Sequence, residues 1–166
     1  FEANMRFTIP LPKKDNFRVN SSYGSGVYYD MASYFYSTAE ILGLYDISKP
    51  KFFGKIGEDK PQWFHSQYNN SKKKLDALFG FGFSYDNSLE LISESTILKF
   101  HRLFTSDSDK EVIVSKTNYC ENFEYRIKDD SFKNYFIYMI HLLDKKDINT
   151  EYQKIKSRYE YFFYNG

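Results

Sequence analysis

Residues 51–74 combine several kinds of side chain that could bind a nucleic acid. The segment holds two glycines, the only tryptophan of the chain, a histidine and three consecutive lysines. Gly54 and Gly57 have the Gly-x-x-Gly spacing of loops that clamp a nucleic-acid backbone, because glycine lets the main chain approach phosphate closely. Such a loop must join two helices, and Pro50 and Pro61 disfavour a helix on either side. The pattern therefore favours an irregular connecting loop over a phosphate site.

The same loop is the best candidate for a recognition surface. Its aromatic rings would stack on bases or sugars while its lysines contact phosphate. The candidate binding residues are Lys55, Trp63, Phe64, His65, Tyr68, Lys72, Lys73 and Lys74. For the three consecutive lysines, a solvated charge run is the simpler alternative.

One arrangement of acidic residues suggests catalysis by a metal-dependent nuclease or another hydrolase. Such sites hold Mg²⁺ through carboxylates and require a group that transfers a proton near by. Asp109 and Glu124 have a tolerable spacing. Arg126 stands where lysine is expected, and a guanidinium keeps its proton near neutral pH. An ordinary solvent-facing strand explains these residues more simply, so this enzyme is the alternative function.

No further local motif indicates catalysis or metal binding. The three histidines, His65, His101 and His141, lie far apart in the sequence and have none of the spacings of metal-ligand pairs. The single cysteine, Cys120, cannot form an intramolecular disulfide, which favours a reducing compartment. We therefore predict no cofactor, no metal and no catalytic residue.

The composition indicates a folded, aromatic-rich protein. The 166 residues are 42% hydrophobic and 27% charged, enough for one domain with a core. The net charge of +1 gives no general support to nucleic-acid binding. The 17 Phe and 16 Tyr accompany many Lys and Asn, as an AT-rich genome would produce. Residues 1–166 are expected to form a single domain, and the start at Phe1 suggests either a trimmed chain or a piece of a longer protein.

Residue periodicity in the first half predicts two strands and two helices. Residues 5–11 and 17–20 alternate between apolar and polar, which predicts an N-terminal β-hairpin. Residues 28–42 carry an apolar stripe, which predicts a long amphipathic helix ended by glycine at position 43, with Tyr34 off the stripe. Residues 46–70 are interpreted as a long connection. A short helix is expected from residue 71 to residue 79.

The second half predicts strands followed by helices. Residues 89–128 indicate a three-stranded antiparallel β-meander. Residues 132–143 are apolar on nearly every side, so this helix is expected at the centre of the core. A capping box formed by Thr150 and Gln153 predicts a last helix. Its narrow face for a partner or a second copy consists of Tyr152, Ile155, Tyr159 and Phe162.

Together these patterns predict one α+β domain: an N-terminal hairpin, a long amphipathic helix, an antiparallel meander and a C-terminal helical pair. The expected function is a non-enzymatic binding or interaction module with a protein or single-stranded nucleic-acid partner. No apolar run reaches the roughly 18 residues of a membrane span. A cytoplasmic location is expected, with no contact to a membrane.

Overall fold

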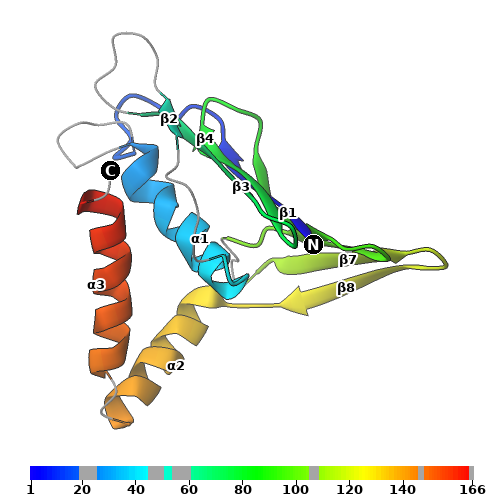
Figure 1. The fold of residues 1–166 in the computed structure, drawn as a ribbon. Helices are drawn as coiled ribbons and strands as arrows, with labels where there is room; N and C mark the ends of the chain where they lie inside the picture. The colour runs from blue at the N-terminus through cyan, green and yellow to red at the C-terminus, as the bar shows by residue number, and fades with distance from the viewer. Residues whose placement is uncertain (19–25, 45–50, 54–60, 105–108, 146–147, 165–166) are drawn as a thin grey trace.

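The chain forms one mixed β-sheet with helices, an α+β architecture (Figure 1). The computed structural model describes residues 1–18, 26–44, 51–53, 61–104, 109–145 and 148–164. The strands are β1 (Glu2–Ile9), β2 (Lys51–Phe53), β3 (Trp63–Asn69), β4 (Lys74–Phe81), β5 (Asp86–Ile92), β6 (Thr96–His101), β7 (Glu111–Asn118) and β8 (Asn122–Lys128). The helices are α1 (Val27–Ile41), α2 (Ser131–Asp144) and α3 (Ile148–Tyr164).

The sheet has eight strands in the order β2-β3-β4-β1-β5-β6-β7-β8. Neighbouring strands are antiparallel except β1 and β4, which run parallel and pair along the whole length of β1. Strands β5 to β8 form a four-stranded meander, one strand longer than expected. The chain therefore places β1, its first strand, in the middle of the sheet.

Helix α1 covers one face of the sheet and makes the core, as Figure 1 shows. Its buried stripe confirms the amphipathic helix that periodicity predicts. Alternate residues of β1 and β4 face this stripe, so the odd-numbered positions of both strands are buried, except Ile9, which is half-buried. The core consists mainly of Ala3, Met5, Phe7, Val27, Met31, Ala32, Phe35, Ala39, Phe64, Leu75, Ala77, Phe79, Leu89 and Phe104.

The C-terminus of α1 ends in a Schellman motif. Gly43 has a φ of 66°, and its N–H donates to Glu40 O while Leu44 N–H donates to Ala39 O. The ammonium of Lys73 donates to the carbonyls of Leu42 and Gly43, each at 3.0 Å. These bonds satisfy carbonyls that a helix end leaves open, and the positive charge complements the helix dipole.

Three predictions for the first half are wrong. Both edges of β1 are occupied by β4 and β5, so β1 has no hairpin with residues 17–20, of which 17 and 18 form a turn and the others lie outside the described residues. The predicted connection 46–70 contains β2 and β3. The predicted helix 71–79 is strand β4, because tertiary pairing with β1 and β3 overrides its helical composition.

The C-terminal helical pair is confirmed, although its position differs from the prediction. Asp130 caps α2 by accepting a hydrogen bond from Lys133 N, and Thr150 lies inside α3 and not at its cap. Helix α2 leads away from the end of β8, and α3 turns back from it (Figure 1). Helix α2 is not central to the core, since large apolar side chains remain exposed along it. They include Tyr135, Phe136, Ile137, Ile140 and Leu143.

Candidate functional site

The first half of α1 carries a group of polar side chains at one end of the sheet. At this end, β1 and β6 finish and β5 begins. Asp30 lies in the first turn of α1, where the helix dipole favours a negative charge. Arg18 donates its Nε–H to Asp30 Oδ2 at 2.8 Å, and Gly26 N–H donates to Arg18 O. The turn before the helix is thus joined to the helix start.

Tyr34 follows Asp30 by one helical turn and lies against the aromatic core. Its ring meets Phe7 edge-on at 5.4 Å between centroids and Phe104 at 5.9 Å. Burial raises the pKa of Tyr34, the negative charge of Asp30 raises it further, and the positive charge of Arg18 offsets part of the rise. The phenol is therefore protonated at neutral pH, as an ordinary tyrosine is, and it can donate a hydrogen bond.

Asn87 holds the chain after β6 beside this group. Its side-chain oxygen accepts from Phe104 N at 2.9 Å, and its backbone oxygen accepts from Arg102 N at 2.6 Å. These bonds bring the ring of Phe104 onto Phe7, where the two stack at 5.5 Å. Arg18, Asp30, Tyr34 and Phe104 thus converge from three distant segments.

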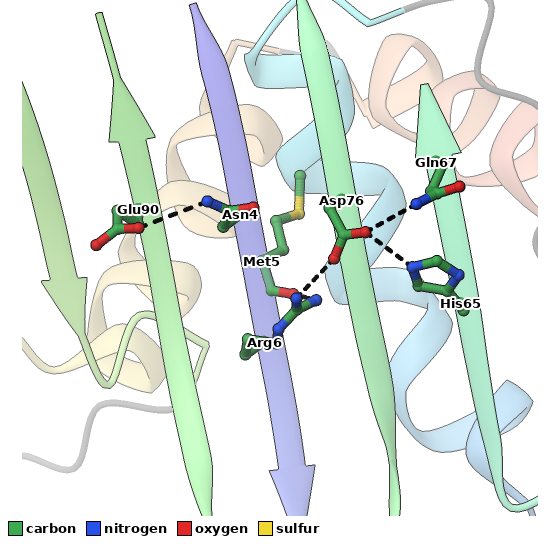
Figure 2. A network of polar contacts seen from close by, with 7 residues as sticks. All are labelled: Asn4, Met5, Arg6, His65, Gln67, Asp76 and Glu90. Carbon is green, nitrogen blue, oxygen red and sulfur yellow. Dashed lines mark hydrogen bonds and ion pairs between the residues drawn. The ribbon is translucent and has the colours of Figure 1, made fainter. Parts of the chain in front are cut away.

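A second polar cluster lies on the sheet face turned away from α1 (Figure 2). Asp76 accepts from Arg6 at 2.6 Å, from His65 at 2.9 Å and from Gln67 at 3.1 Å. Burial raises the pKa of Asp76, but the hydrogen bonds from His65, Gln67 and Arg6, with the charge of Arg6, lower it below its ordinary value. Both carboxylate oxygens already have donors, so we interpret this cluster as a structural cross-link between β1, β3 and β4.

The residues predicted to form a recognition surface do not share one face. Trp63 and His65 alternate with Phe64 and Tyr68 along β3, so the two pairs lie on opposite sides of the sheet. Phe64 is fully buried and stacks on Phe79 at 5.1 Å. A common stacking platform is therefore absent from this strand.

The lysines of the predicted recognition surface do not form one described group. Lys73 bonds the C-terminus of α1, and Lys72 and Lys74 flank it beside an open hollow of about 590 Å³. Lys55 lies outside the described residues. A binding role for these residues stays a prediction.

The carboxylates predicted for a metal site do not assemble in the described residues, and the predicted partner face on α3 stays a prediction. Glu124 pairs with Arg126 at 2.8 Å on the edge strand β8. Within the described ranges, no three His, Cys, Asp or Glu side chains come together as metal ligands, Asp109 included. On α3, Tyr152 and Ile155 are exposed, and the side chains of Tyr159 and Phe162 lie outside the description.

Sequence reasoning missed the group around Tyr34. The available signal was the spacing of Asp30 and Tyr34, four residues apart on a predicted helix with Tyr34 off the apolar stripe. The contributions of Arg18 and Phe104 depend on contacts between distant segments and had no signal in the sequence.

The fold is shared with solved oxidoreductase structures. KijD10, a 3-ketoreductase from Actinomadura kijaniata in complex with NADP and TDP-benzene, matches with a TM-score of 0.66 and 17% identity over 76% of this chain and 40% of the reductase. A KijD10 structure with NADP matches over 95% of this chain and 44% of the reductase, with a TM-score of 0.59 and 16% identity. The protein yvaA from Bacillus subtilis, whose name marks it as an oxidoreductase, matches with a TM-score of 0.59 and 9% identity over 87% of this chain and 48% of its own length.

No protein-family model and no curated protein sequence matches the chain. The chain spans about 40% of the reductase structures that it resembles. At these identities the likeness shows the fold.

These neighbours overturn three predictions. The leading function, a non-enzymatic binding module, and its alternative, a nuclease built on Asp109 and Glu124, are both wrong, since the fold is one found in oxidoreductases. The predicted protein or nucleic-acid partner is also wrong, because the ligands of these neighbours are small molecules, NADP and TDP-benzene. Of the described helices, none is long and apolar enough to cross a membrane.

Proposed function

We propose that this chain is the substrate-side domain of an oxidoreductase that interconverts a ketone and an alcohol on a small molecule. The observation that carries the proposal is the likeness to a 3-ketoreductase over 76% of the chain, with a TM-score of 0.66. The polar group at the start of α1 supports it, because that group supplies a proton donor beside an aromatic surface. Residues 1–166 are then one domain of a larger enzyme.

Tyr34 is the proposed proton donor. When a ketone is reduced to an alcohol, the carbonyl oxygen must receive a proton, and a positioned acid accelerates this step by about 10²–10⁴-fold. Like an ordinary tyrosine, Tyr34 carries its proton at neutral pH, and burial and the charge of Asp30 raise its pKa further. Arg18 and Asp30 form an ion pair one turn away. Besides burial, the charge of Asp30 raises the pKa of the Tyr34 phenol, and the charge of Arg18 lowers it.

The residues of this chain do not fit a complete dinucleotide site. Dinucleotide-binding folds place the pyrophosphate at a Gly-x-Gly-x-x-Gly turn that follows a strand of a parallel sheet. The sequence contains no such motif. In the described part of the sheet, only β1 and β4 are parallel. We therefore assign NADP binding to another part of the enzyme, and the residues of this chain have no proposed role in it.

The test is the Tyr34→Phe variant of the intact enzyme that contains this chain. We expect kcat for NADPH-dependent reduction of a nucleotide-linked keto sugar to fall at least about 100-fold, because the proton donor is lost. Substrate binding should remain, since the ring and its contacts with Phe7 and Phe104 are kept. One matched KijD10 structure carries the same type of change, tyrosine to phenylalanine.

The matched control is Tyr29→Phe, which removes a phenol from an exposed position on the same helix. This variant should keep full activity. A Tyr34→Phe enzyme with kcat within twofold of the unaltered enzyme would exclude Tyr34 as the proton donor.

A cytoplasmic location is also part of the proposal. Its support is Cys120, a free and exposed thiol, because such thiols persist in reducing compartments.

A further inference from the structure

Arg102 has an unusual backbone conformation directly after β6. Its φ is 63°, which makes it the one non-glycine residue with a positive φ among those described. This left-handed conformation is unfavourable for a residue with a Cβ atom, and glycine avoids the strain. Strained residues of this kind cluster at ligand-binding sites, where the surrounding structure holds them in place.

The side chain of Arg102 has a second unfavourable feature. Its Nε is buried, and it has no hydrogen-bond partner within the described part of the chain. A guanidinium only donates hydrogen bonds, and a buried donor without an acceptor is destabilising. Two unfavourable features thus coincide in one residue. An anionic ligand would compensate for the second, because it supplies acceptor oxygens to the guanidinium.

Arg102 lies at the same end of the sheet as the proposed proton donor. Asn87 fixes it there through the bond from Arg102 N to Asn87 O and fixes Phe104 through its side chain. The Phe104 ring contacts Tyr34 at 5.9 Å. The other arginine of this region, Arg18, is already paired with Asp30 at 2.8 Å.

We infer that Arg102 binds a phosphate group of the substrate and so holds the substrate beside Tyr34. This inference rests on the proposed function and adds the substrate class, a phosphate-bearing ketone or alcohol. Phosphate suits the site because a guanidinium offers parallel N–H donors that match two phosphate oxygens. The contact positions the substrate and takes no part in the transfer of the proton.

Arg102→Gly tests the inference without the usual risk of misfolding. Glycine accepts a φ of 63° freely and removes the buried Nε, so the melting temperature should stay unchanged or rise. Isothermal titration of the intact enzyme with thymidine diphosphate and with inorganic pyrophosphate should show a Kd at least tenfold higher for the variant. A purely structural Arg102 would leave both Kd values unchanged, and that result would overturn the inference.

Three further titrations sharpen the result. Arg126→Ala removes an exposed arginine on β8 and should leave the Kd for thymidine diphosphate unchanged. Arg102→Lys keeps the charge but not the paired donors, so its Kd should lie between the unaltered enzyme and Arg102→Gly. Binding of glucuronate in preference to thymidine diphosphate would indicate a carboxylate ligand and overturn the assignment to phosphate.

The outcome also separates this inference from the proposed function. If Tyr34→Phe keeps its turnover while Arg102→Gly loses thymidine diphosphate binding, the proton donor is wrong and the phosphate site stands. If Tyr34→Phe loses turnover while Arg102→Gly binds thymidine diphosphate normally, the proton donor stands and the phosphate site is wrong.

Discussion

Two aspartates of this protein, Asp30 and Asp76, each pair with an arginine, but their surroundings differ. Both oxygens of Asp76 accept hydrogen bonds from within the sheet, from Arg6, His65 and Gln67. Asp30 meets Arg18 through one oxygen and lies one turn from the phenol of Tyr34. The pair of Asp76 and Arg6 cross-links strands. The pair of Asp30 and Arg18 instead lies near the phenol of Tyr34, which carries the proton that the proposed reaction needs. This contrast is why the α1 site, and not the open-face cluster, carries the proposed function.

The cross-linking role of Asp76 predicts a pH-dependent loss of stability in the Asp76→Asn variant. The pKa of Asp76 is lowered in the folded protein, so its contribution is fully present above the unfolded value of about 3.9 and disappears as the pH falls through the folded pKa. We expect the variant to be less stable by about 1 kcal/mol at pH 7, since the cluster is partly exposed and Asn still accepts hydrogen bonds. Urea unfolding at pH 7, 5 and 3 measures this difference.

The control for this experiment is Asp15→Asn, which changes an exposed aspartate in the turn after β1. It should show no difference at any of the three pH values. A loss in Asp76→Asn that is equally large at pH 3 and pH 7 would contradict an electrostatic origin.

At the scale of the elements, the pairing of β4 with β3 leaves no room for a side chain at Gly80. A Cβ atom at this position would clash with Trp63 Cβ and lie 3.0 Å from Trp63 Cα, and neither atom can move without the β3 backbone. We expect Gly80→Ala to lower the free energy of unfolding by on the order of 3 kcal/mol, because the strands must separate locally. Thermal or urea unfolding measures the loss.

Gly82 provides the matched substitution. Its φ is 86°, and nothing lies within 4 Å of an added Cβ atom, so Gly82→Ala adds backbone strain without a clash. This variant should lose only about 1–2 kcal/mol. An equal loss in both variants would show that the close approach at Gly80 relaxes easily.

Elements with one dominant periodicity could be predicted from the sequence, and those with two could not. Helix α1 has a single apolar stripe and a glycine in the left-handed conformation at its end, so its bounds were nearly correct. In β4, the order Leu75, Leu78, Phe79 fits a helix, whereas Leu75, Ala77, Phe79 fits a strand. The parallel pairing with β1 stabilises the strand conformation of these residues. That partner lies about 70 residues away, and local sequence has no information about it.

The site was less predictable than the fold for the same reason. Asp30 and Tyr34 are neighbours on one helix, so their spacing was readable. Phe104 reaches Tyr34 only because Asn87 binds its backbone, and Arg102 is notable only for its φ and its buried Nε. These properties arise from tertiary contacts and backbone geometry, which single-sequence periodicity does not encode.

At the scale of the whole molecule, the chain divides into a packed part and an open part. It exposes 11299 Å² of surface, whereas a compact monomer of 19.8 kDa exposes about 8,600 Å². The described residues of β8 are all exposed, and so is most of α2. The proposed site lies in the packed part, on α1, β1 and the segment after β6. Its geometry therefore depends little on the C-terminal helices.

This division predicts two classes of backbone amide in hydrogen–deuterium exchange. Amides of α1, β1 and β4 are covered by the core and should exchange slowly, close to the rate of global unfolding. Amides of α2 should exchange much faster, because a helix of 14 residues is marginal in water unless its apolar face is packed, and most apolar side chains of α2 remain exposed. Mass spectrometry of peptic peptides from the isolated chain gives both rates in one experiment, with α1 as the internal control. Protection of α2 equal to that of α1 would contradict the open arrangement, since it would require its apolar side chains to be covered in solution.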